Sequence, residues 1–317
     1  MSDLGFAFPM SRLGREPDIP PGGIVVVACV RNEMLRLPWF LAHHRKLGVA
    51  HFLIIDNDSE DGTIEFLRQQ PDVTLFETPM SYAESKCGVL WQNAVLDAYV
   101  QGRWALILDA DEVLVYPRCE SLPMRALINY LEHTGADAFM APLLDMYSDG
   151  PIMATGYVSG APFTEACPYF DCNTYEYASI GPGGSQTRIR GGPRRRLFWD
   201  AAEVDHPAPF LTKIPLIFWK SGRALEASTH ILRDARMSEA TGVLLHFKFL
   251  QDFAERAQIE TARKEHFAGA RQYAAYWQAM SGDPDLSAYH AGATKYRDSL
   301  QLVELGLMRM PSGYPEG

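Results

Sequence analysis

A short apolar run that ends abruptly in carboxylates occupies residues 104–112 (WALILDADE). Five of its first six residues are apolar, which is typical of a strand buried on both faces of a sheet. Three acids follow within four residues, at Asp109, Asp111 and Glu112. In an extended chain, Asp109 and Asp111 point to the same side. Two such carboxylates at the end of a buried strand are costly unless a cation lies between them.

Two interpretations of these acids stay open on this segment alone. A hard divalent ion with oxygen ligands would satisfy Asp109 and Asp111, and phosphate groups would fill its other positions. Acidic residues are also favoured in the first turn of a helix, because they interact well with the helix dipole. The rest of the chain has to decide between a metal site and a helix N-terminus.

Strand-like and helix-like segments alternate through the first half of the chain. Continuous apolar runs predict strands, and apolar residues at helical spacing predict the helices between them. We expect strands at 24–30, 51–55, 73–76 and 104–108, and helices at 38–47, 61–68 and 82–99. This order predicts an α/β fold, with a Rossmann-like, mostly parallel central sheet and helices on both faces.

Polar residues follow three of these strands at the point where each strand ends. The segments are Arg31-Asn32-Glu33, Asp56-Asn57-Asp58 and Asp109-Ala110-Asp111. Parallel α/β sheets bind their ligands beyond the carboxyl ends of the strands. The shared location of these side chains therefore predicts a single site, which favours the ligand-binding interpretation of the acids.

The second half of the chain is less regular. We expect a helix at 123–133, strands at 138–144, 213–219 and 243–249, and a long amphipathic helix or helix pair at 252–280. Residues 148–209 are rich in Gly, Pro and aromatics and form too long a stretch for an inert connection. They predict loops that shape a substrate site, with a short strand near 194–199, and the tail after Met310 is expected to be disordered.

These segments predict a division of the chain into three parts. Residues 1–23 form an N-terminal arm, and 24–250 form the main domain, with a ligand-binding half at 24–117 and a second half at 118–250. Residues 251–317 form a helical C-terminal extension.

Composition narrows the partners and the compartment. The net charge of -10 and the pI near 5.4 argue against nucleic acid as the main partner. The five cysteines are odd in number and none are spaced like a zinc site, so we expect a reduced, cytoplasmic setting. No segment approaches the roughly 20 apolar residues of a membrane span, so a soluble protein is expected, with peripheral membrane association left open. A local basic patch remains at Arg188, Arg190, Arg194, Arg195 and Arg196.

Three motifs together resemble the nucleotide-binding half of family 2-like glycosyltransferases, which have the GT-A fold. Residues 24–33 (IVVVACVRNE) resemble the opening strand, and residues 52–63 (FLIIDNDSEDGT) resemble the second strand with its acidic turn. Residues 106–112 (LILDADE) resemble the DxD motif. The resemblance covers the first 117 residues, and the RNE and DNDS variants are similar to a bacterial branch of these enzymes.

The resemblance implies a nucleotide-sugar site built from these motifs. Asp56 would contact the base, Lys86 would approach the phosphates, and Asp109 would lie near the ribose. Asp58 departs from the usual Asp-Asp-Gly-Ser ending of the family, so it is equally well explained as a turn residue. The residues implied to line the donor are Arg31, Asn32, Glu33, Asp56, Asp58, Lys86, Asp109 and Ala110.

The resemblance also implies a divalent ion, Mn²⁺ or Mg²⁺, that bridges the diphosphate and acts as a Lewis acid. Asp109 and Asp111 would be two of its ligands. These enzymes often take a further ligand from a downstream histidine, for which His246 is the first candidate and His230 the second. His246 lies within an apolar run, so a packed core histidine is an equal alternative.

An inverting transfer needs a carboxylate that deprotonates the acceptor hydroxyl. Asp145 is favoured because it follows a predicted strand as Asp109 does, and Glu112 is instead expected to form a salt bridge or cap a helix. The arginines between 188 and 196 would bind a diphosphate or an anionic acceptor, or lie on a solvated loop. The full set of candidate bases is Asp145, Asp149, Glu203 and Asp205.

The sequence therefore predicts a metal-dependent glycosyltransferase that moves a sugar, with inversion, from a nucleotide-sugar, namely a UDP-sugar, to an acceptor hydroxyl. The acceptor would be a bacterial surface glycan or its lipid-linked precursor, and the lack of a Gln-x-x-Arg-Trp sequence argues against a processive synthase. One alternative is a sugar nucleotidyltransferase, which needs a Gly-rich basic loop that Arg31-Asn32-Glu33 does not supply. The other is a degenerate protein that only binds a nucleotide or glycan. The chain has no clear match to the family's acidic catalytic-base motif, which favours this alternative, whereas the intact Asp109 and Asp111 count against it.

Overall fold

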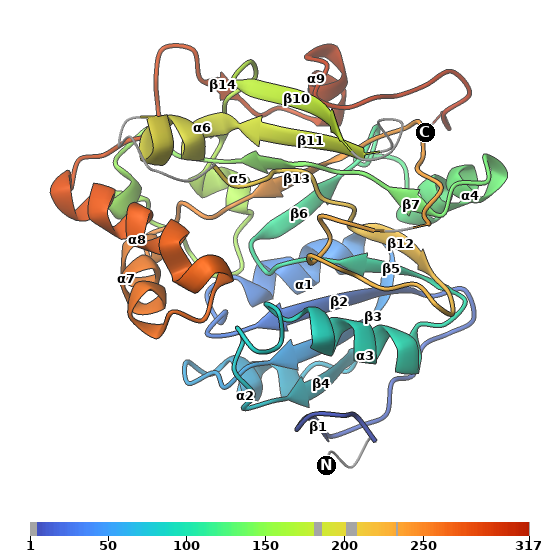
Figure 1. The fold of residues 1–317 in the computed structure, drawn as a ribbon. Helices are drawn as coiled ribbons and strands as arrows, with labels where there is room; N and C mark the ends of the chain where they lie inside the picture. Colours follow the sequence, from blue (N-terminus) through green and yellow to red (C-terminus); the bar gives the residue numbers. More distant parts are fainter. Residues whose placement is uncertain (1–4, 181–185, 201–207, 233, 317) are drawn as a thin grey trace.

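The computed structural model describes residues 5–180, 186–200, 208–232 and 234–316. A seven-stranded sheet lies at its centre, with strand order β1-β4-β3-β2-β5-β12-β7 (Figure 1). Four neighbouring strands of this sheet run parallel. They are β4 (Val73–Glu77), β3 (Val49–Asp56), β2 (Ile24–Val30) and β5 (Arg103–Ile107). The predicted α/β fold with a mostly parallel central sheet is therefore confirmed.

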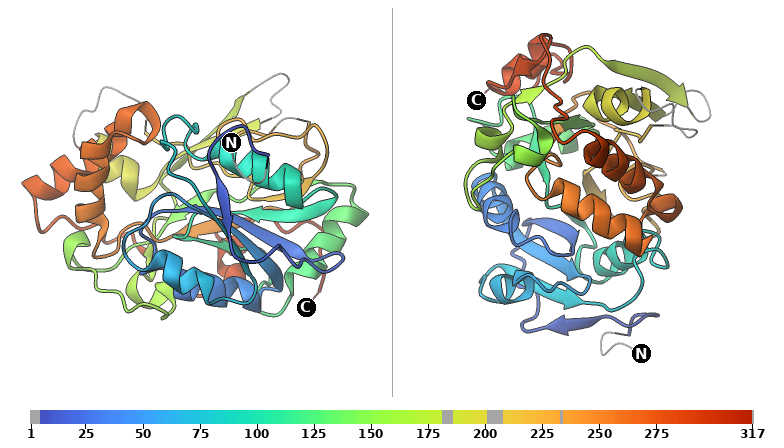
Figure 2. Two further views of the ribbon diagram at one scale, coloured as in Figure 1. Left: turned by 90° about the horizontal axis from the view of Figure 1, so that it is seen from below. Right: turned by 90° about the vertical axis from the view of Figure 1, so that its left-hand side faces the viewer.

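Helices cover both faces of this sheet (Figure 2). Since successive side chains of a strand point to opposite faces, the even-numbered residues of β2 pack in the same core as α1 (Leu37–Lys46). Val25 and Val27 pack in the core that contains α3 (Val89–Tyr99). The layer of α1 also contains α2 (Thr63–Arg68) and α4 (Met124–His133). The all-apolar sequence of β2 thus reflects a strand with a core on each side.

Antiparallel strands complete both edges of the sheet. The N-terminal arm is part of it, because β1 (Ser11–Leu13) pairs with β4. On the other side, β12 (Leu216–Trp219) lies between β5 and β7 (Ala138–Phe139), antiparallel to both. As β12 runs against β5, the residues just before β12 lie beside the residues just after β5. Lys213 therefore reaches the carboxyl end of the parallel strands.

A second sheet has three strands. Its order is β6 (Glu112–Val115), β13 (Val243–His246) and β8 (Leu143–Asp145). The register sets His246 opposite Glu112 on one neighbour and opposite Asp145 on the other. Residues from three distant segments of the chain therefore meet at one end of this sheet.

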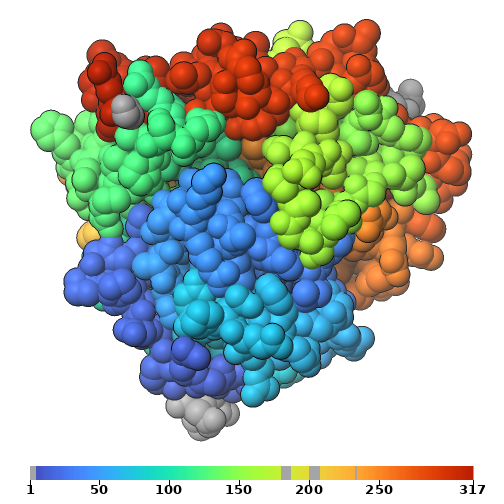
Figure 3. All heavy atoms as spheres, turned by 180° about the vertical axis from the view of Figure 1, so that it is seen from behind, coloured from blue at the N-terminus to red at the C-terminus, as the bar shows by residue number. Residues whose placement is uncertain are grey.

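The remaining elements lie outside these two sheets. The pair β10 (Tyr175–Ile180) and β11 (Gln186–Gly191) forms an antiparallel ribbon in the region expected to consist of loops. Seen from behind, residues near 160 lie directly on the first-half residues (Figure 3), where the Ser159 hydroxyl donates to the Met34 carbonyl at 3.4 Å. The short elements are η1 (Ile152–Ala154), α5 (Phe163–Ala166), β9 (Tyr169–Phe170) and β14 (Thr294–Lys295).

The first C-terminal helix, α7 (Phe253–Arg263), is fastened to the first half by a double ion pair, called here the Arg36–Asp252 clamp. Arg36 donates two hydrogen bonds of 2.7 Å to Asp252, and Arg256 donates to Glu33 at 2.6 and 3.0 Å. Arg36 is buried, so its guanidinium depends on these carboxylates. Two further helices follow along the chain, α8 (Phe267–Gly282) and α9 (Ser299–Glu304).

Three expectations for the second half differ from the structure. Residues near 194–199 are helical, in α6 (Gly192–Arg195) and the π-helical turn Arg196–Asp200, because Pro193 lacks an N–H for a strand ladder and suits the first turn of a helix. The segment 138–144 forms two strands in different sheets instead of one. After Met310, Tyr314 is buried against Tyr130, with ring centroids 5.1 Å apart.

Two further findings concern the helices and the cysteines. No helix in the described part of the chain is both long and apolar enough to cross a bilayer. All five cysteines are free thiols in the structure.

Candidate functional site

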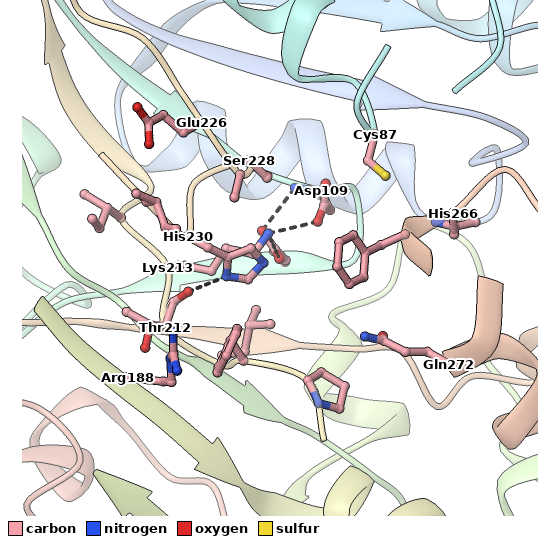
Figure 4. Close-up of a pocket in the computed structure, with 18 of the residues that line it drawn as sticks. Cys87, Asp109, Arg188, Thr212, Lys213, Glu226, Ser228, His230, His266 and Gln272 are labelled. Atoms are coloured by element: carbon pink, nitrogen blue, oxygen red, sulfur yellow. Dashed lines mark hydrogen bonds and ion pairs between the residues drawn. The ribbon is translucent and has the colours of Figure 1, made fainter. Parts of the chain in front are cut away.

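A large cavity opens beyond the carboxyl ends of the parallel strands, where the sequence predicts a ligand site. Its volume is about 1730 Å³. The sheet contributes Cys29, Asp109 and Lys213 to its lining, the second sheet contributes His246, and residues 264–273 close it from the C-terminal side. Figure 4 shows Asp109, Lys213 and His230 near the middle of the pocket, with His266 and Gln272 facing them from across it.

Lys213 supplies a cation to the acids that follow β5. Its ammonium lies 3.1 Å from Asp109 Oδ2 and 2.9 Å from Glu112 Oε1 (Figure 4 shows the contact with Asp109). The other oxygen of Glu112 accepts the backbone N–H of Asp109 at 3.1 Å. Glu112 therefore forms a salt bridge, which is one of the two roles expected for it, and its second oxygen stabilises the turn after β5.

Burial and charge act in opposite directions on these three groups. Desolvation opposes ionisation of Asp109, but the ammonium of Lys213 holds the pKa of Asp109 below its ordinary value. Burial raises the pKa of Glu112 to about 7, even though Lys213 acts against this. For Lys213, burial is outweighed by the two carboxylates, so its pKa lies above the ordinary value. The ammonium therefore stays charged and remains the fixed cation of this part of the site.

A row of four buried, ionisable side chains lies behind Asp109. Asp111 Oδ2 is 3.4 Å from His246 Nε2, and His246 Nδ1 is 2.5 Å from Asp145 Oδ1. Asp145 Oδ2 accepts a hydrogen bond of 2.8 Å from Arg194 Nε. The row alternates acid and base, so each carboxylate faces at least one cationic or hydrogen-bonding partner. We call it the Asp111–Arg194 row.

These contacts influence the pKa of His246 and fix the orientation of its ring. Burial would lower the pKa of His246, but Asp111 and Asp145 raise it above the ordinary value. Burial would raise the pKa of Asp145, but Arg194 and His246 lower it to about 2. Since Asp145 holds Nδ1, the ring presents Nε2 to Asp111.

The row fits part of a metal site. Among residues 5–180, 186–200, 208–232 and 234–316, no three or more His, Cys, Asp and Glu side chains are gathered so as to hold a metal ion. Asp111 and His246, however, lie 3.4 Å apart, and two ligands at right angles on one ion are roughly 3 Å apart. A carboxylate on the far nitrogen is also the usual support of a metal-bound histidine. Asp109, the third implied ligand, is bound to Lys213 instead.

The residues implied to line the donor fall into separate places. Lys86 and Asp109 line the cavity. Ala110 is buried in the core, and Glu33 is held beneath Arg256 in the Arg36–Asp252 clamp. The structure therefore brings only part of this set to the cavity.

The others join the loops that follow β2 and β3. Arg31 donates to the Asn57 carbonyl at 2.6 Å and to Asp58 at 3.3 Å, and Asn32 Oδ1 accepts from the Glu60 N–H at 2.8 Å. None of Arg31, Asn32, Asp56 or Asp58 is among the described residues that line the cavity.

Asp56 keeps one oxygen without a partner at the end of β3. Its Oδ1 accepts from the Ser59 N–H at 3.0 Å, whereas its buried Oδ2 has no hydrogen-bond partner among the described residues. Burial raises the pKa of this carboxyl. An unfilled acceptor at a strand end is the kind of group that a ligand N–H can satisfy.

Of the four candidate bases, the two that the structure describes, Asp145 and Asp149, do not line the cavity. The Asp145 side chain is 0 % exposed and both of its oxygens are engaged, so it does not reach a substrate in this structure. Asp149 is exposed outside the lining. Glu203 and Asp205 lie outside the described residues.

His230, the second candidate for a metal ligand, lines the cavity as a neutral ring. Its Nδ1 lies 2.5 Å from the Thr212 carbonyl, which can only accept, so Nδ1 carries the proton and Nε2 keeps its lone pair. Burial lowers its pKa to about 4. His43 and His44 pack in and around α1, and burial lowers their pKa values to about 4 and about 3.

The basic patch separates into residues with different partners. Arg194 belongs to the Asp111–Arg194 row, Arg195 pairs with Glu176 at 2.7 Å, and Arg196 contacts Asp171. Arg188 and Arg190 line the cavity.

The most important residue of the cavity that the sequence did not predict is Lys213. Its only signal in the sequence is a lone cation at the first position of the predicted strand 213–219.

Comparisons with known proteins find structural likeness at low similarity. No family model and no curated protein matches this sequence. A Bacillus anthracis protein assigned as a glucose-1-phosphate thymidylyltransferase, in complex with sucrose, is 11% identical with a TM-score of 0.36, over 80% of this chain and 98% of that one. A UTP-bound UGPase from Acinetobacter baumannii is 11% identical with a TM-score of 0.31, over 90% and 92% of the two chains.

A CMP:2-keto-3-deoxy-manno-octonic acid synthetase in complex with CTP is 10% identical with a TM-score of 0.29, over 90% of this chain and 98% of that one. These names correspond to the sugar nucleotidyltransferase alternative more closely than to the glycosyltransferase prediction. At these identities and TM-scores, the function has to be argued from the site itself.

Proposed function

We propose that the protein is a metal-dependent glycosyltransferase that binds a nucleotide-sugar, a UDP-sugar, in the described cavity and transfers the sugar to an acceptor hydroxyl. The single observation that carries the proposal is the pair of Asp111 and His246 Nε2 at 3.4 Å, with Asp145 supporting the histidine from behind. This pair lies next to Asp109, at the carboxyl end of a parallel sheet, where such folds bind ligands.

Asp111 and His246 would hold Mn²⁺ or Mg²⁺ under this proposal, with Asp109 as a further ligand when it leaves Lys213. The bound ion would stabilise the negative charge of the departing diphosphate. Lys213 places a permanent ammonium beside the same carboxylate, so it also faces the region where that charge develops. We assign Asp145 a positioning role, because it orients His246 and is shielded from the cavity.

Calorimetric titration of the protein with UDP, with and without Mn²⁺, tests the proposal. We expect Mn²⁺ to strengthen UDP binding at least tenfold, and Asp111→Ala to remove that gain. Asp149→Ala is the matched control, because Asp149 is exposed outside the cavity lining. UDP binding that is indifferent both to the metal and to Asp111→Ala would refute the proposal. If UDP binding does depend on the metal, slow hydrolysis of a panel of UDP-sugars, followed as released UDP, would identify the donor sugar. It would also distinguish an enzyme from a protein that only binds the nucleotide.

A sugar nucleotidyltransferase would need a loop after the first strand that can hold a nucleoside triphosphate. The backbone N–H groups of that loop are already engaged here. Those of Asn32, Glu33 and Met34 donate to the side chains of Ser59, Thr63 and Asp61 at 2.8–3.0 Å. We therefore expect no pyrophosphate release from UTP, CTP or dTTP with sugar 1-phosphates, and steady release would favour the alternative.

A further inference from the structure

The cavity lining has a charge opposite to that of the whole protein. The chain carries a net charge of -10, yet nine Lys or Arg residues and four Asp or Glu residues are found among the described residues that line the cavity. Positive charge is therefore concentrated where a ligand enters. Such a cavity raises the local concentration of anions and favours an anionic ligand.

Two of these cations share one aromatic ring on β11. Arg188 and Arg190 lie two residues apart on the strand, so both side chains point to the same face. Their guanidinium carbons lie 4.2 and 4.5 Å from the centroid of the Phe210 ring. Contact with the same ring restricts the rotational freedom of both side chains before any ligand arrives.

No carboxylate among the described residues pairs with either arginine, although Arg194, Arg195 and Arg196 nearby each have one. Arg190 Nε is in addition buried without a hydrogen-bond partner in the described part of the chain. Two adjacent positive charges with a buried, unused donor are unfavourable unless an anion neutralises them. The arrangement is therefore that of a binding site for a doubly charged group.

The pair lies across the cavity from the proposed metal ligands. Thr212 Oγ1 accepts from the Ile189 N–H of β11 at 2.9 Å, and the Thr212 carbonyl contacts His230. Thr212 and His230 therefore lie between β11 and Lys213. Figure 4 shows Arg188 on the far side of His230 from Asp109. The cavity of about 1730 Å³ also exceeds the 300–1,000 Å³ of a typical single-ligand pocket, which leaves room for a second molecule.

We propose that Arg188 and Arg190, supported by Phe210, bind a phosphate group carried by the acceptor. A phosphate monoester carries close to two negative charges near neutral pH, which matches two guanidinium groups better than a carboxylate does. The identification of the ligand as the acceptor rests on the proposed function. The phosphate site itself depends only on the arginines and the ring.

Calorimetric titration with phenyl phosphate, on the protein saturated with UDP and Mg²⁺, tests this proposal. We expect one phenyl phosphate to bind, and Arg188→Gln and Arg190→Gln each to weaken its binding at least tenfold. Arg190→Lys should lose less affinity than Arg190→Gln, since it keeps the charge and loses only the fork. Arg68→Gln, at an exposed position of α2 outside the cavity, is the charge-matched control and should have no effect.

Several results would overturn the proposal. They are a lack of phenyl phosphate binding, binding that is unchanged in Arg188→Gln and Arg190→Gln, and binding of benzoate as tight as that of phenyl phosphate. Phenyl phosphate that binds the UDP-free protein but not the protein saturated with UDP would show instead that the arginines hold the diphosphate of the donor. If UDP does not bind at all, the proposed function fails, while arginine-dependent binding of phenyl phosphate would still support the phosphate site. Circular dichroism melting of each variant identifies any that fails to fold. If Arg190→Gln fails to fold, the affinity of Arg190→Lys for phenyl phosphate is measured in its place.

Discussion

Replacing Asp145 by Asn separates two roles of one buried carboxylate. In the protein, Asp145 accepts from His246 at 2.5 Å and from Arg194 at 2.8 Å, and its side chain is 0 % exposed. The amide keeps the shape of the side chain but removes the charge that both partners face. Arg194 would then be a buried cation without a counterion, and the His246 ring would lose the contact that fixes it.

The stability change can be estimated in two ways. The pKa of Asp145 falls from its ordinary 3.8 to about 2, and a shift of this size corresponds to about 2 kcal/mol of stability at neutral pH. Removing one partner of a buried ion pair typically costs about 3–5 kcal/mol. We therefore expect Asp145→Asn to lower the free energy of unfolding at pH 7 by about 2–4 kcal/mol, as measured by urea denaturation.

The sign of the pH dependence follows from the lowered pKa. The contribution of Asp145 is fully present above the unfolded value near 4 and is lost as the pH falls through about 2. Asp145→Asn lacks this contribution at every pH. The stability difference between the two proteins should therefore shrink when urea denaturation is repeated between pH 4 and pH 2.5.

The functional change is measured as metal-dependent UDP affinity, which should fall about 10–100-fold because a supporting contact of the histidine is removed. Asp137→Asn is the control. Asp137 is a buried acid that contacts Lys220 and Arg223 at 2.9 and 3.0 Å outside the cavity lining. It should also destabilise the protein but leave UDP affinity unchanged. Unchanged stability and unchanged UDP affinity in Asp145→Asn would refute this account of the Asp111–Arg194 row.

Three further predictions concern other parts of the molecule. Gly242→Ala should lower the free energy of unfolding by about 1–3 kcal/mol, as measured by urea denaturation, since its Cβ would lie 2.5 Å from a backbone oxygen of β6. Gly282→Ala, with open space around it, should be neutral. Arg36→Met should cost about 3–5 kcal/mol, because the carboxylate of Asp252 loses both of its 2.7 Å hydrogen bonds while Glu33 keeps only Arg256, and an unchanged unfolding curve would contradict that reasoning. Lys213→Met should weaken UDP binding in the absence of metal more than in its presence, as seen by calorimetry, and equal losses would show that the ammonium does not face the ligand.

The parallel half of the fold could be predicted because local pattern and tertiary environment agree there. The segment 24–30 is apolar at every position, and the strand β2 has a core on both faces, so the prediction and the observed strand coincide. The segment 138–144 shows the opposite case. Its apolar residues suit any sheet, and the sequence does not reveal that the chain leaves one sheet and enters another near Pro142. Long-range pairing decided the outcome there.

The site shows the same division between local and distant information. Asp109 and Asp111 could be proposed as candidates from their position after a buried strand, and His246 only through a resemblance. Lys213 could not be identified, because its role depends on β12 running antiparallel to β5, which no local pattern around residue 213 encodes. Likewise, Asp145 looks like a free acid after a strand until Arg194 and His246 are seen on either side. The sequence alone therefore indicates the acidic residues, whereas their cationic partners become visible only in the folded structure.

The Arg36–Asp252 clamp also has a temporal consequence. Its two residues are 216 positions apart in the chain. At roughly 5–20 residues per second, a ribosome that has released Arg36 needs about 10–40 s more to release Asp252. During that interval the nascent first half carries a guanidinium that it cannot yet bury with its counterion. The final closure of this half is therefore expected to be a late event in synthesis. Refolding of the whole chain from denaturant, in which both residues are present from the start, is free of that delay.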